Sequence, residues 1–291
     1  MSSILKKIFS SKSKSTKRTS KAIGILGSGR CGTSMVTRAI SFLGVDIGSD
    51  FVKENRTNPK GFWENKEIVS IHKQIKSELG KRPFPDGWED KESIQPMKQE
   101  LRALIEDQFL GKDLWGWKDP RTTESLAVWK EILRDLSVST NYIIMVRNPI
   151  DVAASYQEAY NRKEGRAIRQ WQMRTLLALR GTNNENRIII DYDELLENSL
   201  EAMRRVANTF ELPWPENEAD LKKELDSFID PDLQHSRTTL EELESMEDVD
   251  SDIKRLYRLC LEGAESQEFL HSASFAAQIE ELYQSVEERN F

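Results

Sequence analysis

Residues 24–36 read "GILGSGRCGTSMV", a glycine-rich turn between a short apolar run and a helical pattern. Two glycines five residues apart match the nucleotide-binding loop G-x-x-x-x-G-K-[ST], and Ser34 fills its final hydroxyl position. Thr33 occupies the lysine position, so the cation that reaches the terminal phosphates of a triphosphate is missing, and Arg30 is the cation of the loop. Backbone amides and the helix dipole still attract a phosphate. The stretch therefore predicts a P-loop-like strand–loop–helix that binds a 5′-phosphate-type anion rather than a triphosphate.

Three further apolar runs each end in a polar cluster; they are "DLWGW" (113–117), "NYIIMV" (141–146) and "RIII" (187–190). Longer segments with apolar residues at helical spacing separate these runs. Strands that alternate with helices favour a parallel sheet covered by helices on both faces. We therefore predict a three-layer α/β/α fold with a central parallel sheet. Since ligands of such sheets bind beyond the carboxyl ends of the strands, the polar clusters are expected to converge on one crevice.

Charge is distributed unevenly along the 291 residues. Residues 1–21 carry six lysines, one arginine and no acid, whereas the whole chain has a net charge of −7. This composition predicts a disordered basic Ser/Lys tail at 1–21 and one α/β domain at 22–291. The acidic body disfavours nucleic acid as a partner. The tail is interpreted either as a solubilising segment or as a contact with a membrane surface.

The cysteines and histidines bear on the cellular compartment and on metal binding. Two cysteines and no run of 18 apolar residues predict a cytoplasmic protein without a membrane span. No His, Cys and Asp residues cluster at the spacing of metal ligands, so no metal site is expected. Cys31 lies next to Arg30 and a helix N-terminus, which lower a thiol pKa, and it is expected to be prone to oxidation.

A second phosphate site is predicted by "VRNPIDVAASY", residues 146–156. Arg147 follows a strand, Asn148 is placed to cap the next helix, and Pro149 suits the first helical position. Ser155 comes eight residues after Arg147. The two side chains are expected to grip one anion between the strand end and the helix.

Two anion sites of this kind, in this order, resemble the sulfotransferases that use 3′-phosphoadenosine 5′-phosphosulfate (PAPS). "GSGRCGTS" is similar to the 5′-phosphosulfate loop of that family, with a cysteine in place of the usual serine, and "RNPIDVAASY" is similar to its 3′-phosphate motif. The resemblance spans roughly residues 22–200 and fits the bacterial-type branch best. It continues through "NPKGFWE" (58–64), "KDPR" (118–121) and "DYDELL" (191–196). It implies PAPS as donor, adenosine 3′,5′-bisphosphate as product, and no metal.

The resemblance also implies roles for particular residues. The donor is expected to contact Ser28, Gly29, Arg30, Cys31, Gly32, Thr33, Ser34, Arg147, Ser155 and Tyr192. Arg30 and Lys118 are expected to stabilise the leaving phosphate oxygen, and Glu64 to accept the proton of the acceptor. Asp119 and His72 are the alternatives for this base, with His72 expected on a helix surface.

"DPDLQHSR", residues 230–237, resembles a late motif of the bacterial-type branch. It implies that His235 and Arg237 close over the donor. The acceptor is expected to be a small molecule, glycan or lipid that offers a hydroxyl or amine. The acidic body disfavours highly sulfated polysaccharides, which leaves neutral alcohols, sugars, lipids or phenols. Two rival functions are a divergent P-loop nucleotide kinase and a non-catalytic nucleotide-binding protein with the same fold.

Overall fold

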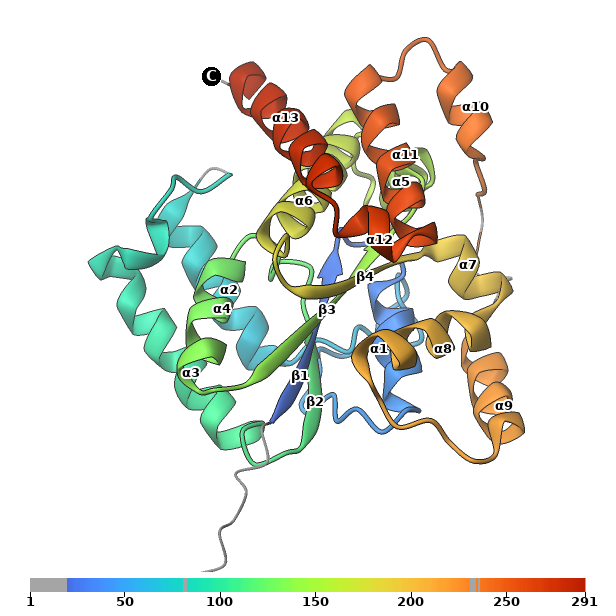
Figure 1. Ribbon diagram of the computed structural model, residues 1–291. Coiled ribbons are helices and arrows are strands. Elements are labelled where there is room, and N and C mark those ends of the chain that lie inside the picture. The colour runs from blue at the N-terminus through green and yellow to red at the C-terminus, as the bar shows by residue number, and fades with distance from the viewer. Residues whose placement is uncertain (1–19, 81–82, 231–233, 235, 291) are drawn as a thin grey trace, which may run out of the picture.

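The centre of the molecule is a parallel sheet of four strands in the order β2-β1-β3-β4 (Figure 1). The computed structural model describes residues 20–80, 83–230, 234 and 236–290. The strands are β1 (Lys21–Gly27), β2 (Leu114–Lys118), β3 (Ser139–Val146) and β4 (Asn186–Asp191). Their parallel pairing confirms the sheet predicted from the apolar runs. The chain crosses from β1 to β2 on one side and to β3 on the other, so the loop after β1 lies where the strand order reverses.

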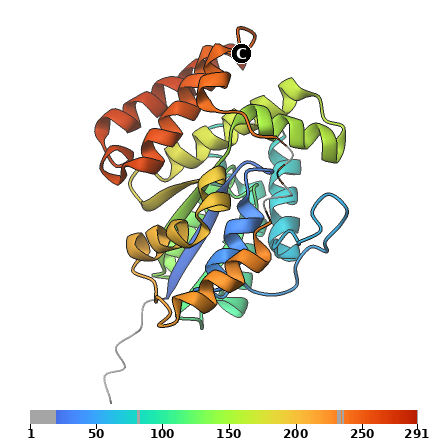
Figure 2. The ribbon, with the colours of Figure 1, turned by 90° about the vertical axis from the view of Figure 1, so that its right-hand side faces the viewer.

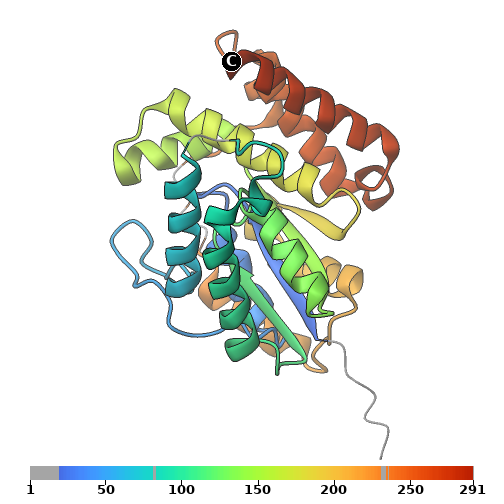
Figure 3. The same cartoon turned by 90° about the vertical axis from the view of Figure 1, so that its left-hand side faces the viewer.

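Helices cover both faces of the sheet, which confirms the three-layer α/β/α prediction. Figures 2 and 3 show α1 and α8 on one face and α4 and α6 on the opposite face. The helices before β4 are α1 (Thr33–Ser41), α2 (Lys66–Leu79), α3 (Gln95–Gln108), α4 (Leu126–Asp135), α5 (Pro149–Tyr160) and α6 (Glu164–Gly181). Those after β4 are α7 (Tyr192–Glu197), α8 (Ser199–Phe210), α9 (Glu218–Phe228), α10 (Leu240–Ser245), α11 (Ser251–Glu265), α12 (Gln267–Leu270) and α13 (Ala273–Asn290). α11 packs against β4 and α13 against α6.

Polar residues fix where several helices begin. The side chain of Asn148 accepts a hydrogen bond from the amide of Ile150, and Pro149 starts α5, as predicted. Asn65 caps α2 and Asp191 caps α7 in the same way. α1 differs, because its N-cap residue is Gly32 and no described side chain accepts its first amide groups. Those amide groups are therefore available to donate hydrogen bonds to a ligand beyond the end of β1.

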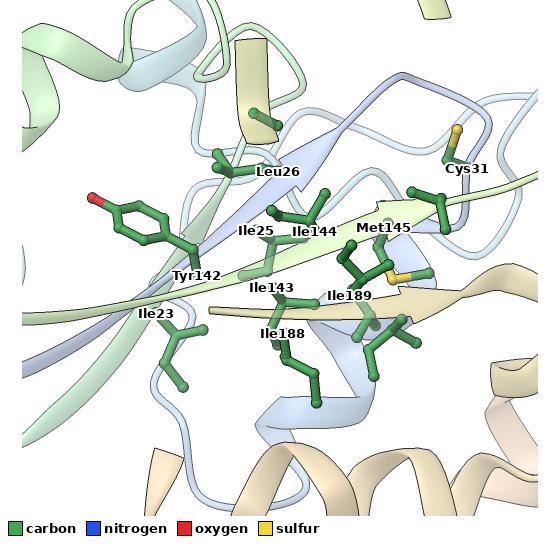
Figure 4. Packing of buried hydrophobic residues seen from close by; sticks show 14 of the residues in the cluster. Ile23, Ile25, Leu26, Cys31, Tyr142, Ile143, Ile144, Met145, Ile188 and Ile189 are labelled. Carbon is green, nitrogen blue, oxygen red and sulfur yellow. The ribbon is translucent and has the colours of Figure 1, made fainter. Parts of the chain in front are cut away.

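Isoleucine-rich strands build the core between the layers (Figure 4). Ile25 of β1 pairs in register with Ile143 of β3, which pairs in turn with Ile188 of β4, and all three are fully buried. A second buried element is the stack of Trp117 on Trp129, whose ring centroids lie 4.3 Å apart. This packing anchors β2 and α4, and with them the turn that follows β2.

The N-terminal boundary differs slightly from the one predicted from composition. Ser20 and Lys21, assigned to the basic tail, belong to the described body, since Lys21 begins β1 and Ser20 accepts a hydrogen bond from Trp115. The rest of the predicted tail, residues 1–19, lies outside the described residues. Within the described part of the chain, no helix combines the length and the apolar character needed to cross a membrane.

Candidate active site

The loop between β1 and α1 holds a conformation that is unusual for its residues. Arg30 has a φ of 72° and Gly32 a φ of 82°. A positive φ costs a non-glycine residue of order 1–2 kcal/mol, so the surrounding contacts must hold Arg30 in place. The result is a tight turn that presents the open N-terminus of α1 to the crevice.

Contacts of two arginines join the predicted 5′-phosphate loop to the predicted 3′-phosphate motif. The Nε of Arg30 donates a hydrogen bond of 2.9 Å to the Oγ of Ser155, on α5. The Nη1 of Arg147 donates to the carbonyl oxygen of Arg30 at 3.3 Å, and its guanidinium lies 4.2 Å from the ring centroid of Tyr192. Residues from the ends of β1, β3 and β4 therefore meet at one place, as the sequence predicted.

The same loop has features that fit a phosphate-bearing nucleotide. A Cβ on Gly29 would lie 2.4 Å from the hydroxyl of Tyr156, and one on Gly32 would lie 2.7 Å from the ring of Tyr192. Position 32 therefore requires glycine, because its φ is positive as well, whereas a side chain at position 29 would have to displace the hydroxyl of Tyr156. The Nε of Arg147 and the Oγ of Ser28 are buried without a hydrogen-bond partner among the described residues. Such orphaned donors are what an incoming oxyanion satisfies.

A buried ion pair lies beside this loop. The Nζ of Lys118, at the end of β2, donates to the Oε1 of Glu64 at 2.9 Å and to the Oγ of Ser34 at 3.1 Å. The side chains of Lys118 and Glu64 are only 1% and 10% exposed. Arg121 lies on the other side of Glu64, with 3.5 Å between its Nη1 and Oε2. Two predicted catalytic residues are thus in direct contact, and Lys118 connects the candidate base to the phosphate loop.

His72 and Asp119 occupy different surroundings from those expected of reserve bases. His72 is buried rather than on a helix surface, so that expectation was wrong. Its Nδ1 hydrogen bonds to Asp119 at 2.8 Å, and its Nε2 accepts from the indole of Trp129 at 2.9 Å. Accepting at Nε2 leaves the proton on Nδ1, so the imidazole is neutral and both its nitrogens are occupied.

Asp119 is fully buried and forms an ion pair with Arg121. Burial alone raises its pKa, but the hydrogen bond from His72 and the charge of Arg121 outweigh that effect, and the pKa lies well below its usual range. Its Oδ1 accepts from the Nη1 of Arg121 at 2.6 Å and from the backbone amide of Arg121 at 2.9 Å. The carboxylate therefore fixes the arginine guanidinium beside Glu64.

The prediction for Cys31 was wrong. Its side chain is fully buried, and burial raises the thiol pKa to about 12 even though the charge of Arg147 lowers it. A buried thiol of this kind is inert rather than oxidation-prone. Cys31 packs in the core beneath the loop (Figure 4).

These residues surround a large open cavity of about 1070 Å³. Of the residues predicted to contact the donor, those at its wall are Gly29, Arg30, Gly32, Thr33, Ser34, Arg147, Ser155 and Tyr192. Glu64 and Lys118 line it as well. Ser28 and Cys31 are buried behind the loop. Among the described residues, no three His, Cys, Asp or Glu side chains are grouped so as to hold a metal ion.

Comparison with known proteins places this chain in a family. A sequence model described as the sulfotransferase family matches residues 22–216, more than half of the chain. The chain belongs to the sulfotransferase family. No curated protein sequence is significantly similar to it.

Several solved sulfotransferase structures are similar to this one. The sulfotransferase domain of the olefin synthase from Synechococcus PCC 7002 is 16% identical, with 82% of this chain and 94% of that chain covered and a TM-score of 0.45. The sulfotransferase domain from the curacin biosynthetic pathway is 14% identical, with 93% and 98% covered and a TM-score of 0.43. The mouse sulfotransferase SULT7A1, solved in complex with PAP, is 11% identical, with 92% and 84% covered and a TM-score of 0.39.

The sulfotransferase site includes polar contacts that the sequence did not predict. Asp151 accepts hydrogen bonds from the hydroxyl and amide of Thr238, at 2.8 and 3.1 Å, and Ser236 offers its carbonyl oxygen to Arg147 at 3.2 Å. The segment that contains Ser236 and Thr238 therefore contacts the predicted 3′-phosphate motif. Arg237, expected to close over the donor, is instead 55% exposed and pairs with Glu197 and Asp193. His235, the other residue expected there, lies outside the described residues.

The loop before α2 also contributes to the sulfotransferase site. The carbonyl oxygen of Thr57 accepts from Arg30 at 2.9 Å, and the side chain of Asn58 donates to Ser34 at 3.2 Å. The motif "NPKGFWE" begins at Asn58, so its first residue was a usable signal for this contact. Thr57 acts through its backbone, which no residue type reveals.

Proposed function

We propose that this sulfotransferase transfers the sulfuryl group of PAPS to a hydroxyl or amine of an acceptor, such as a sugar, a lipid or a small alcohol. The observation that carries the proposal is the joining of two anion-binding motifs by Arg30, which contacts Ser155 through its side chain and Arg147 through its carbonyl oxygen. A donor with separate 5′ and 3′ phosphates matches that pair of sites. A triphosphate does not, because Thr33 replaces the loop lysine.

The first part of the donor site would hold the 5′-phosphosulfate. The open amides of α1 and the hydroxyls of Thr33 and Ser34 surround the position that this group would take. Arg147 and Ser155 would hold the 3′-phosphate, and the ring of Tyr192 would contact the adenine. The bidentate donors of a guanidinium suit a phosphate, and the Nε of Arg147 has no other described partner.

The transfer itself is an in-line displacement. The acceptor oxygen attacks sulfur, the bond between sulfur and the 5′-phosphate oxygen breaks, and the acceptor proton moves to Glu64. Lys118 donates to both Glu64 and Ser34, so it is placed to stabilise the negative charge on the leaving oxygen. Arg30 and the loop amides share this role. Proton removal by a positioned carboxylate contributes about 10²–10⁴-fold to such a rate.

Thermal unfolding with nucleotides tests the donor site. Adenosine 3′,5′-bisphosphate, present at 100 times its dissociation constant, is expected to add about 2.7 kcal/mol to the free energy of unfolding. The 5′-monophosphate of adenosine, which lacks the second phosphate, is expected to add much less. Stabilisation by ATP with Mg²⁺ but not by the bisphosphate would refute the proposal and favour a kinase. Stabilisation by the bisphosphate, followed by transfer of ³⁵S from labelled PAPS to an acceptor, would establish the enzyme.

A further inference from the structure

An arginine outside the sequence motifs reaches the same cavity from α6. Arg174 lines the cavity, although only 8% of its side chain is exposed. Its Nε donates a hydrogen bond of 2.9 Å to the Oε1 of Glu124, which lies in the turn between β2 and α4 and has a side chain 4% exposed. A buried charge destabilises a fold unless it is paired, and this pairing also fixes the orientation of the guanidinium.

The other end of this guanidinium is available to a ligand. Neither Nη1 nor Nη2 of Arg174 donates a hydrogen bond to a described residue, and neither belongs to the polar atoms that are fully buried without a partner. Since Arg174 lines the cavity, these two groups face it. A guanidinium that is fixed at Nε and open at both Nη atoms suits the oxygens of an anion.

Arg174 lies near the proposed base. Burial lowers the pKa of its guanidinium, whereas the charges of Asp119 and Glu64 raise it, so both carboxylates lie within electrostatic reach. The helix that carries it, α6, packs against β1 and β3, while α1 covers the opposite face of the sheet (Figures 2 and 3). Arg174 therefore approaches the site from the side opposite to the hydroxyls of Thr33 and Ser34.

The preceding turn of α6 is in contact with the phosphate loop through a tyrosine. Gln170, four residues before Arg174 and on the same helix face, donates to the Oη of Tyr156 at 3.2 Å. A Cβ on Gly29 would lie 2.4 Å from that hydroxyl. Gln170 and Tyr156 line the cavity as Arg174 does. This face of α6 is therefore the wall of the cavity that adjoins the glycine-rich loop.

The sulfuryl group carries peripheral oxygens besides the one that leaves with the phosphate. The loop amides and the lysine at the end of β2 are assigned to the leaving oxygen. Arg121, beside Glu64, already pairs with that carboxylate and with Asp119. Arg174 is a cation near Glu64 whose Nη groups have no such partner in the described part of the chain. Donors fixed in advance in a buried site are effective at stabilising the charge of a transition state.

We propose that Arg174, held by Glu124, binds the peripheral sulfonate oxygens of PAPS while the loop binds its 5′-phosphate. This inference rests on the proposed function, because it assigns a further catalytic residue to the same reaction. The bond between sulfur and the 5′-phosphate oxygen breaks, the bond from the acceptor oxygen to sulfur forms, and the acceptor proton moves to Glu64. Arg174 keeps its protons throughout and stabilises negative charge. It would therefore distinguish PAPS from adenosine 3′,5′-bisphosphate, which lacks the sulfuryl group.

The ratio of two dissociation constants tests the inference. Binding of PAPS and of adenosine 3′,5′-bisphosphate to the full chain is measured by calorimetry in the absence of an acceptor. In the double variant Glu124→Gln/Arg174→Gln, neutral amides replace the ion pair, so neither position keeps an unpaired buried charge. We expect PAPS to bind about tenfold more weakly or worse, because hydrogen bonds to a charged group are lost. The affinity for the bisphosphate is expected to stay the same.

The matched control is Glu124→Gln alone, which makes the same change at position 124 and keeps Arg174. It is expected to retain most of the wild-type affinity for PAPS, because the guanidinium is still present and can donate to the amide oxygen at 124. Urea denaturation reports whether each variant folds. Arg174→Lys is the second variant if the double variant does not fold: it keeps a cation for Glu124 but loses the guanidinium fork, and the same selective loss of PAPS binding is expected.

The outcomes separate the inference from the proposed function. Failure of the wild-type chain to bind either nucleotide would overturn the proposed function and the inference with it. An unchanged ratio of the two dissociation constants, with both nucleotides bound, would overturn the inference alone. Equal weakening of PAPS and the bisphosphate would also overturn it, because Arg174 would then contact a phosphate that both share. So would an equal loss in Glu124→Gln, because the missing carboxylate alone would explain the effect.

Discussion

Replacement of Glu64 by glutamine is the most direct test of the proposed chemistry. The amide has the shape of the carboxyl group, so its oxygen can still accept the hydrogen bond that Lys118 donates to Oε1 at 2.9 Å. It cannot accept the acceptor's proton. We therefore expect kcat to fall by about 10²–10⁴-fold. The limb of the pH–rate profile that reports protonation of the base is expected to disappear as well.

The structure also predicts how the variant's stability and nucleotide affinity change. Lys118 is 1% exposed and loses the negative charge of its partner, so the free energy of unfolding is expected to fall by about 1–3 kcal/mol. Removal of a carboxylate from a cavity that is proposed to bind phosphates is not expected to weaken their attraction. The dissociation constant of adenosine 3′,5′-bisphosphate is therefore expected to stay the same or decrease.

Three measurements distinguish these effects: transfer of ³⁵S from labelled PAPS, calorimetry with the bisphosphate, and denaturation by urea. Glu67→Gln is the matched control, since it makes the same chemical change three residues along, at a carboxylate outside the cavity lining. A Glu64→Gln enzyme whose kcat stays within about threefold of the wild-type value would refute the role of Glu64 as the base. A fall in kcat matched by the control would refute it too.

Three further predictions concern the donor site and its supports. Arg147→Lys keeps the charge but loses the guanidinium fork, so calorimetry should show about 10–100-fold weaker binding of adenosine 3′,5′-bisphosphate and unchanged binding of 5′-AMP; equal losses for both would contradict a 3′-phosphate site. Gly32→Ala places a Cβ 2.7 Å from Tyr192 at a positive φ, whereas Gly44→Ala has a similar φ and open space, so urea denaturation should show a loss larger by about 1 kcal/mol or more for Gly32→Ala. Burial and nearby acids raise the pKa of Asp191 from 3.8 to about 6, so its ionisation destabilises the folded state as the pH rises through 6. Asp191→Asn keeps a good helix cap and should add about 2–3 kcal/mol to the free energy of unfolding at pH 7.5 and little at pH 4; an equal gain at both would contradict this reasoning.

The strands and the phosphate loop were predictable because local sequence encodes them. Runs such as "NYIIMV" are almost continuously apolar, as strands buried on both faces of a parallel sheet are. Each helix cap depends on residues only one or two positions away in sequence. The glycines of the loop fix a backbone shape that few sequences allow. Arg30, Arg147 and Ser155 followed from these local signals together with the order in which parallel strands present their ends.

Burial and charge around the site were decided by tertiary packing. His72 lies against Trp129 and Asp119, which come from a distant part of the chain, and no helical pattern specified that contact. Cys31 follows the cationic Arg30 in sequence, but burial in the core raises the pKa of its thiol.

Net charge shows the same division between sequence and structure. Net charge is a sum over all residues, so it identifies the chain as acidic but does not locate any charge. The cavity collects basic side chains from β2, α2, α6 and several loops, and its potential depends on the distances among those few groups. The sequence alone therefore determined the elements, the phosphate loop and the family. Only the folded chain determined which side chains are buried and which charged groups line the cavity, because both depend on contacts between segments that are far apart in sequence.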